Sequence, residues 1–188
     1  MDKLRIAVIL AANRRGRTGP AVSRWFAELA VKYPDQDVVF DFLDVAEIGP
    51  ADGHGGPMAP APARTVAEAD GYVVLTPEYN HGYPGELKSA IDAARREWFG
   101  KAVGFVSYGG MSGGLRAVEQ LRLVFSELHT ATIRDTVSLH NAQAMFGEDG
   151  EPLVDLAASE AAVERMLRQL TWWALALREA RERRPYPG

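Results

Sequence analysis

The 188-residue chain has no cysteine, no long apolar run and a deficit of positive charge. Without cysteine it can form no disulfide, thiolate nucleophile or iron–sulfur cluster on cysteine ligands. No segment approaches the ~18 consecutive apolar residues of a membrane-spanning helix. The 21 Lys and Arg residues oppose 25 Asp and Glu, and the resulting net charge of −4 has the wrong sign for nucleic acid or an anionic membrane surface. We therefore expect neither a membrane nor a nucleic-acid partner.

What remains is typical of a globular protein. The chain is 47% hydrophobic and 24% charged, close to the average soluble protein, and its length suits a single domain spanning residues 1–188. The apolar run Ile6–Ala12 follows Lys3 and Arg5, as in a secretion signal, but no small-residue cleavage site follows it. We interpret this run as a buried strand and expect a cytoplasmic protein.

Strand-like and helix-like segments alternate along the chain. Short apolar runs predict buried parallel strands at Leu4–Leu10, Val38–Leu43, Gly71–Leu75, Ala102–Ser107 and Thr130–Ser138. Apolar spacing predicts helices from Gly19-Pro20 to about Tyr33, at Arg64–Asp70, at Pro84–Ala94, from an N-cap at Ser112 to Leu128, and at Asp155–Arg183. This alternation specifies an α/β fold with helices on both faces of a parallel sheet. Periodicity alone leaves the strand order open.

Two segments need interpretation. Residues 44–63 contain four Gly and four Pro, which predicts either a functional loop or a loop that hides a short element. The last helix carries an apolar stripe, which we expect to be buried and which comprises Val163, Met166, Leu167, Leu170, Trp173 and Leu177. The Trp172-Trp173 pair is interpreted as core or subunit interface, and the charge run Arg178–Arg184 as a solvated helix end.

The first strand leads into a basic loop. Arg14, Arg15 and Arg17 precede Thr18 and a helix N-terminus, where backbone N–H groups and the helix dipole favour an anion such as phosphate. Guanidinium groups can bind two phosphate oxygens at once. The loop has neither a Walker lysine nor a Gly-x-Gly-x-x-Gly fingerprint, which disfavours nucleoside triphosphates and a dinucleotide site. The alternative is a solvated basic turn.

Two more loops follow the third and fourth strands. Thr76–Gly85 holds two prolines, two glycines and two tyrosines, so its backbone path is restricted and it offers flat apolar surface. Ser107–Gly114 holds four glycines, which allow close backbone approach and convergent N–H groups. In parallel α/β sheets ligands bind beyond the carboxyl ends of the strands. The three loops together predict a slot with an anion site and two main-chain walls, the shape of flavin mononucleotide (FMN).

The sequence resembles the NADPH-dependent FMN reductase family, which includes chromate/quinone reductases and azoreductases. The resemblance runs from about Lys3 to Leu128 and is carried by Pro77-Glu78-Tyr79-Asn80, by Pro84-Gly85-x-Leu87-Lys88-x-Ala90-Ile91-Asp92, and by Ser107-x-Gly109-Gly110-x-x-Gly113-Gly114. It implies a flavodoxin-like three-layer sandwich with strand order 2-1-3-4-5, non-covalent FMN, and a homodimer or homotetramer. It also implies that NAD(P)H is the co-substrate and that electrons pass by a ping-pong mechanism to flavin, quinone or azo-type acceptors.

The resemblance also assigns site residues. Arg14, Arg17 and Thr18 are expected to bind the phosphate of FMN. The ring is expected to lie against Pro77, Glu78, Tyr79, Asn80, Ser107, Tyr108, Gly109, Gly110 and Gly113, with N–H groups of Gly109–Gly113 stabilising negative charge on the reduced ring. No catalytic side chain is required, since the flavin carries the chemistry. Glu78 is interpreted as a structural carboxylate rather than a catalytic acid, and His81 as a surface residue. The spacing of His54, His81, His129 and His140 predicts no metal site.

One departure from the family concerns the phosphate loop. The family's loop usually begins Gly-Ser-x-Arg, whereas this chain has Ala11-Ala12-Asn13-Arg14. A lost neutral hydrogen bond is worth ~0.5–1.5 kcal/mol, so affinity for FMN could fall up to about tenfold. Two alternatives to an enzyme therefore stay open: a flavodoxin-like electron-transfer or flavin-binding module without its own NAD(P)H turnover, and a degenerate member that holds no flavin.

Overall fold

The computed structural model describes residues 2–11, 18–35, 37–48, 57–147 and 149–187. Within these ranges five parallel strands form one sheet in the order β2-β1-β3-β4-β5. The strands are β1 (Leu4–Leu10), β2 (Val38–Asp44), β3 (Gly71–Pro77), β4 (Ala102–Tyr108) and β5 (Ala131–Leu139). This is the strand order of flavodoxin-like folds, and it confirms the expected fold class.

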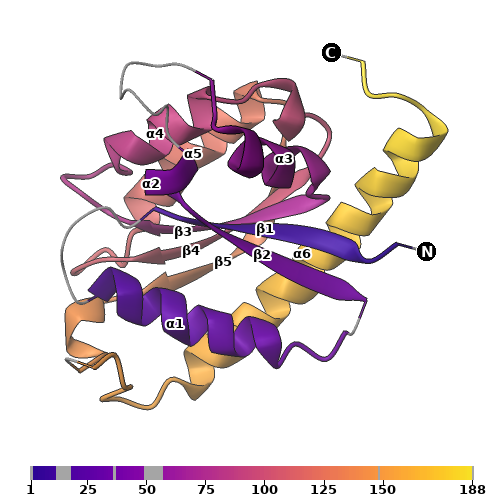
Figure 1. Ribbon diagram of the computed structural model, residues 1–188. Coiled ribbons are helices and arrows are strands. Elements are labelled where there is room, and N and C mark those ends of the chain that lie inside the picture. The colour runs from indigo at the N-terminus through magenta and orange to yellow at the C-terminus, as the bar shows by residue number, and fades with distance from the viewer. Residues whose placement is uncertain (1, 12–17, 36, 49–56, 148, 188) are drawn as a thin grey trace.

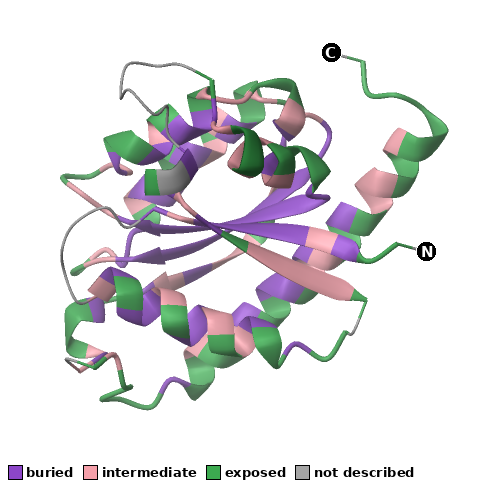
Figure 2. Ribbon diagram, viewed as in Figure 1, coloured by how far each residue is buried: buried purple, intermediate pink, exposed green. Residues whose placement is uncertain are grey.

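Helices cover both faces of the sheet. On one face lie α1 (Thr18–Val31) and α6 (Ala157–Arg183); on the other lie α2 (Val45–Ile48), α3 (Pro60–Glu68), α4 (Gly85–Asp92) and α5 (Leu115–Glu127) (Figure 1). Ile6 and Val8 of β1 pack in the core beneath α1 and α6, whereas Ala7 and Ile9 pack in the opposite core. Figure 2 shows the central strands almost wholly buried between the two helical layers, as expected for a parallel sheet. None of the helices seen in the described ranges is both long and apolar enough to cross a membrane.

The proline-rich segment 44–63 contains two elements that the sequence did not resolve. Residues Val45–Ile48 form α2, and α3 begins at Pro60 rather than at Arg64. Proline is tolerated in the first turn of a helix because its missing N–H would have no intrahelical partner there. Proline at this position therefore opens a helix instead of marking a loop. Residues 49–56 lie outside the described ranges.

The expected N-cap at Ser112 is wrong. Helix α5 is capped by Gly114, whose φ of +86° places it in the left-handed region. A Cβ on Gly114 would lie 2.6 Å from Cβ of Ser107, so both the backbone angle and the space require glycine. The hydroxyl of Ser112 instead bonds to the carboxylate of Glu78.

The apolar stripe of α6 is confirmed except at its end. Val163, Met166, Leu167 and Leu170 are buried, and Leu177 is partly buried against the same core. Trp173 is 39% exposed, and Ala174 takes its place in the core. Residues seven and eleven positions after Val163 lie on the same helical face as Val163, and these are Leu170 and Ala174 rather than Trp173. Trp172 is 64% exposed, so the core interpretation is wrong for both tryptophans, and a subunit contact stays a prediction.

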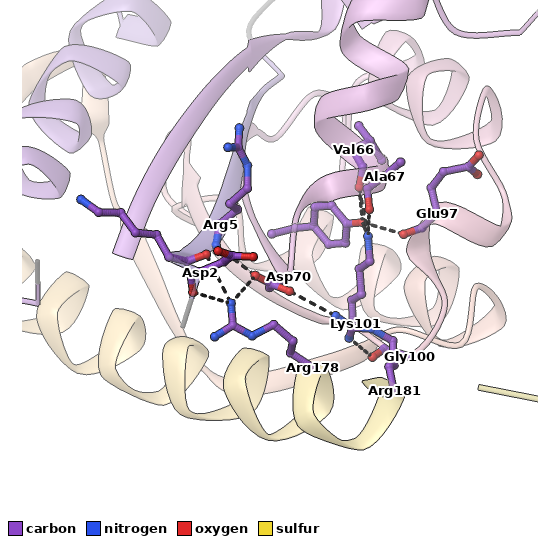
Figure 3. A network of polar contacts seen from close by, with 12 residues as sticks. Asp2, Arg5, Val66, Ala67, Asp70, Glu97, Gly100, Lys101, Arg178 and Arg181 are labelled. Carbon is purple, nitrogen blue, oxygen red and sulfur yellow. Dashed lines mark hydrogen bonds and ion pairs between the residues drawn. The ribbon is translucent and has the colours of Figure 1, made fainter. Parts of the chain in front are cut away.

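The charge run Arg178–Arg184 is solvated only in part: Arg183 and Arg184 are exposed, whereas the interpretation is wrong for Arg178 and Arg181. Arg178 and Arg181 form ion pairs of 3.2 and 3.3 Å with the two carboxylate oxygens of Asp70, just before β3. Arg181 also donates to the carbonyl oxygen of Gly100 at 2.6 Å. Figure 3 shows these contacts joining α6 to the amino-terminal edge of the sheet, opposite to the edge where the strands end. They fix the last helix to the sheet.

Candidate functional site

A cleft of about 220 Å³ opens at the carboxyl-terminal edge of the sheet. Its lining comes from four segments of the chain and comprises Thr18, Gly19, Pro77, Glu78, Tyr79, Tyr108, Gly109, Gly110, Ala142 and Gln143. The loops that follow β3 and β4 thus meet the start of α1, as the sequence predicts. Arg14 and Arg17 lie outside the described residues, whereas Asn80, Ser107 and Gly113 are described but do not line the cleft.

The loop after β3 folds back in a tight turn. Tyr79 and Gly82 exchange backbone hydrogen bonds, 2.9 Å from Tyr79 N to Gly82 O and 3.1 Å in return. Between them, Asn80 and His81 have φ of +50° and +69°. Two successive positive φ values define a turn of the type I′ class, in which asparagine is a favoured residue. Asn80 therefore shapes the turn next to the cleft, and its side chain is exposed.

Glu78 is paired rather than free. Oε1 of Glu78 accepts a hydrogen bond from Nε of Arg116 at 2.6 Å and forms an ion pair with Nη2 at 2.6 Å. Oε2 accepts the backbone N–H of Arg116 at 3.1 Å. Burial acts to raise the pKa of the Glu78 carboxyl, but hydrogen bonds from Ser112 and Arg116, together with the Arg116 charge, outweigh burial and lower that pKa. The carboxylate is therefore ionised at neutral pH. This geometry agrees with a structural role for Glu78.

The glycine-rich loop is held by hydroxyl groups behind it. The carbonyl oxygen of Gly113 accepts hydrogen bonds of 2.8 Å from both Ser107 and Ser138. Ser107 is fully buried, so it supports the loop and does not face the cleft. Gly113 has a φ of +60°, and a Cβ there would lie 2.4 Å from Oγ of Ser138. Glycine at this position is required by both angle and space.

Some backbone N–H groups of the glycine-rich loop Ser107–Gly114 are already used in hydrogen bonds within the protein. The N–H of Gly109 donates to the carbonyl of Leu139 at 3.2 Å, and that of Gly113 donates to Gly110 at 3.2 Å. Two of the N–H groups in the expected Gly109–Gly113 set thus close the loop itself, and the role expected of the others toward a ligand stays a prediction. Those of Gly110, Met111 and Ser112 have no acceptor among the described residues. Gly110 also has open space where a Cβ would stand.

The segment after β5 supplies a wall of the cleft that the sequence motifs do not indicate. Ala142 and Gln143 belong to the short helical turn η2 (Ala142–Ala144). The backbone N–H of Ala142 donates to the carbonyl of Gly109 at 3.0 Å, and that of Asn141 donates to Gly110 at 2.8 Å. These bonds fasten η2 to the glycine-rich loop. The available signal was position alone, since the fifth strand ends at the same sheet edge as the others.

The cleft suits a flat ring with an anionic tail. Glycine backbone and the Pro77–Tyr79 segment line one end, and the first residues of the 14-residue helix α1 line another part. A helix N-terminus offers backbone N–H groups and a positive dipole end to an anion. Burial raises the pKa of Tyr108, so its phenol is neutral. Within the described ranges, no group of three or more His, Asp or Glu side chains is arranged to hold a metal ion.

Comparison with known proteins gives a consistent result. The family model described as NADPH-dependent FMN reductase matches residues 4–144. An NAD(P)H-dependent FMN reductase from Schizosaccharomyces pombe is 34% identical over 122 residues, which are 58% of this chain and 60% of that protein. A 2-hydroxy-1,4-benzoquinone reductase from Burkholderia is 34% identical over 116 residues, 60% of this chain and 58% of that protein. The chain thus spans about three fifths of the length of these curated relatives.

A solved structure supports the fold assignment. The flavoenzyme NAD(P)H:(acceptor) oxidoreductase FerB from Paracoccus denitrificans superposes with a TM-score of 0.64, at 20% sequence identity. The superposition covers 90% of this chain and 98% of that one. At this level of identity the likeness concerns the fold. Together with the strand order, it establishes a flavodoxin-like architecture around the cleft.

Proposed function

Because the chain belongs to the NADPH-dependent FMN reductase family, we propose that it binds FMN non-covalently in this cleft and catalyses NAD(P)H-dependent reduction of small electron acceptors. The observation that carries the proposal is the pairing of two backbone walls at one sheet edge. The Pro77–Tyr79 segment forms one, and Gly109 and Gly110 of the glycine-rich loop form the other. The N–H of Gly110 has no acceptor in the ranges that the structure describes and is therefore available to a ligand.

The residues present fit FMN chemically. A planar isoalloxazine ring needs close backbone approach and hydrogen-bond donors, and Gly110 supplies both, since no side chain narrows the approach. A phosphate needs a cationic or helix N-terminal site, and Thr18 and Gly19 begin α1 at the cleft. We assign the phosphate to this end, with Arg14, Arg17 and Thr18 as its ligands. Pro77, Tyr79, Asn80 and Gly109 are assigned to the ring region.

The protein's part in the mechanism is positioning and electrostatics. FMN held in the cleft would supply the redox chemistry, namely uptake of a hydride from NAD(P)H and transfer of two electrons to an acceptor in a second encounter, and this order would give ping-pong kinetics. The N–H of Gly110 would stabilise negative charge on reduced FMN, because a preorganised dipole needs no reorientation. No side chain has to act as a nucleophile or proton relay.

Quinones are the acceptors that we favour, with flavins and azo compounds as further candidates. The name of the Burkholderia relative, 2-hydroxy-1,4-benzoquinone reductase, supports this choice. A small planar acceptor would occupy the same open face of the ring as the nicotinamide. We further propose that the protein acts as a homodimer or homotetramer in the cytoplasm.

Titration of the purified protein with FMN, followed by flavin fluorescence quenching and calorimetry, tests cofactor binding. We expect saturable binding and then steady NAD(P)H oxidation when a soluble quinone is added, with parallel lines in double-reciprocal plots. Absence of heat and quenching at millimolar FMN would refute the proposal and favour a degenerate member. Binding without NAD(P)H oxidation above that of free FMN would favour the electron-transfer module.

A further inference from the structure

A single arginine ties together the two loops of the cleft. Arg116 lies in the first turn of α5, directly after the glycine-rich loop, and binds Glu78 through Nε and Nη2 at 2.6 Å each. Its Nη1 also contacts Nε2 of His81. Glu78 and His81 flank Tyr79 and Asn80, so one guanidinium holds the turn after β3 from both sides. A guanidinium presents its donors in a rigid fork, which makes such a two-sided contact specific.

A second residue of α5 supports the same turn. Nε2 of Gln120, one helical turn after Arg116, donates to the carbonyl oxygen of His81 at 2.8 Å. A guanidinium only donates hydrogen bonds, so in its contact with Arg116 the Nε2 atom of His81 is the acceptor. Asn80 and His81 both hold left-handed backbone angles, a conformation that costs energy for residues other than glycine. These contacts from α5 help to maintain it.

The pair also sets the charge at the wall of the cleft. The side chain of Glu78 is only 4% exposed, yet Glu78 lines the cleft. An unpaired carboxylate at this wall would repel an anionic ligand, and at low exposure the repulsion is poorly screened. Arg116 cancels that charge at hydrogen-bond distance. With the pair intact, the wall presents a neutral surface and backbone donors to whatever lies in the cleft.

We propose that Arg116 is a positioning residue for FMN: it fixes the Tyr79–Gly82 turn against the glycine-rich loop and neutralises Glu78, which prevents this carboxylate from destabilising the reduced, more anionic form of the cofactor. The inference rests on the proposed function, since it concerns how the cleft holds FMN. It adds a residue to which neither the loop motifs nor the lining of the cleft assigns a role.

The effect of the Arg116 charge can be tested with two variants, one that removes the positive charge of the pair and one that removes its negative charge. In R116Q, Glu78 stays ionised because Ser112 and the backbone N–H at position 116 still bond to it, so the wall gains a net negative charge. We expect the ratio of reduced to oxidised FMN dissociation constants to rise about tenfold, which for a two-electron couple lowers the midpoint potential by ~30 mV. E78Q leaves Arg116 unpaired, and we expect a shift of the potential in the opposite direction.

The positioning component is separated by further variants. The double variant E78Q/R116Q restores a neutral wall but not the guanidinium contacts that hold the Tyr79–Gly82 turn. Its midpoint potential should therefore return toward that of the wild type, while its affinity for FMN stays several-fold weaker. R116K restores the positive charge, but its compact ammonium lacks the planar fork of a guanidinium. It should therefore recover the midpoint potential more fully than the affinity for FMN. Visible circular dichroism of bound FMN should change in R116Q and in the double variant, because the ring loses a fixed wall.

Arg122 provides the matched control. It lies on the same helix, carries the same charge and is held by hydrogen bonds of its own, to the main-chain carbonyls of Ile133 and Arg134, but it does not line the cleft. R122Q should leave the FMN dissociation constant within twofold of the wild-type value. The circular dichroism of bound FMN and its midpoint potential should stay correspondingly close to those of the wild type. If R116Q and E78Q shift the potential in the same direction, or if R116Q behaves as R122Q does, the inference is wrong. Failure of the wild-type protein to bind FMN would instead refute the proposed function.

Discussion

The hydroxyl of Ser107 donates a 2.8 Å hydrogen bond to the carbonyl oxygen of Gly113, across the base of the loop between β4 and α5. Ser138, from the neighbouring strand, donates to the same oxygen at the same distance. Two strands therefore hold one carbonyl, while the N–H groups of Gly110, Met111 and Ser112 have no acceptor in the part of the chain that the structure describes. The loop is rigid by construction rather than merely rich in glycine.

This construction predicts different outcomes at two glycines. A Cβ at Gly113 would meet Oγ of Ser138 at 2.4 Å and Cδ2 of His140 at 2.8 Å, at a φ of +60°. We expect G113A to lower the free energy of unfolding by at least ~2 kcal/mol, from the left-handed angle and the overlap together. G110A meets open space and should stay within about 0.5 kcal/mol of the wild type. Urea unfolding compares the two; equal losses would contradict the account.

The basic loop gives a prediction on cofactor affinity. Charge-assisted hydrogen bonds are worth ~1.5–3 kcal/mol, so replacing Arg14 or Arg17 with alanine should raise the FMN dissociation constant about tenfold or more. Added salt should narrow the difference in FMN dissociation constant between the wild type and these variants, because salt screens the interaction between charges. R15A removes an equal charge from the same loop and serves as the control. Unchanged affinity in both R14A and R17A would overturn the phosphate assignment.

The sequence predicted the strands and the sheet edge at which the cleft opens, because both follow local rules. The run Leu4–Leu10 and the glycine-rich Ser107–Gly114 segment are visible in the sequence itself, and parallel sheets place their loops at one edge. The strand order came from the family resemblance, since periodicity does not encode it. The pairing of Glu78 with Arg116 joins residues far apart in sequence, and no local pattern signals it.

Boundaries and single side chains were harder to predict for a physical reason. Ser112 is a good N-cap residue in general, but its hydroxyl is taken by Glu78 and the cap passes to Gly114. Trp173 and Ala174 lie next to each other on α6, and a difference of one position decides which is buried. Such choices depend on packing against other elements, which a one-dimensional pattern does not contain.

The tryptophans offer a direct test of the burial assignments. Trp98 is 1% exposed and its Nε1 donates to the carbonyl oxygen of Ile91 at 3.0 Å. We expect W98A to cost ~3–5 kcal/mol of stability, against about 0.5 kcal/mol or less for W172A, whose side chain is largely exposed. Guanidinium unfolding measures both. A large loss in W172A that depends on protein concentration would show that a partner copy covers this residue.

The ion pairs of Asp70 with Arg178 and Arg181 clamp α6 to the sheet. They predict that replacing Asp70 lowers the stability of the fold more than replacing an exposed acidic residue. Asp70 accepts from Arg178, Arg181 and the backbone N–H of Arg5, and its side chain is 11% exposed. D70N should cost about 2 kcal/mol, since it leaves two poorly solvated guanidinium groups without a counter-charge. Glu68 pairs with Arg64 on the exposed surface of α3 at 3.9 Å, so E68Q should cost no more than about 0.5 kcal/mol. Thermal unfolding of both variants decides whether the clamp stabilises the fold.

Lys101 makes the stability of this fold depend on pH in the neutral to alkaline range. Nζ of Lys101 lies 2.8 Å from the carbonyl oxygen of Ala67 and 3.1 Å from the hydroxyl of Tyr72 (Figure 3). Burial, aided by the charge of Arg181, lowers the pKa of Lys101 to about 7, whereas an unfolded chain has a lysine pKa of ~10.4. Between these values the unfolded state binds more protons, so stability rises with pH across this window and is lowest below about 7.

The variant K101M isolates this contribution. Methionine fills similar space without a titrating group, so the wild type should gain stability relative to K101M as the pH rises from about 7 to about 10, by at most ~1.4 kcal/mol per pH unit. Urea unfolding of both proteins at several pH values in this window gives the difference, and titrations common to the two cancel. K88M, at the exposed pair of Lys88 with Asp92 on α4, should show no such trend. A pH-independent difference between wild type and K101M would mean that the buried amine keeps its ordinary pKa, because the carbonyl oxygens of Val66 and Ala67 and the hydroxyl of Tyr72 replace the lost water.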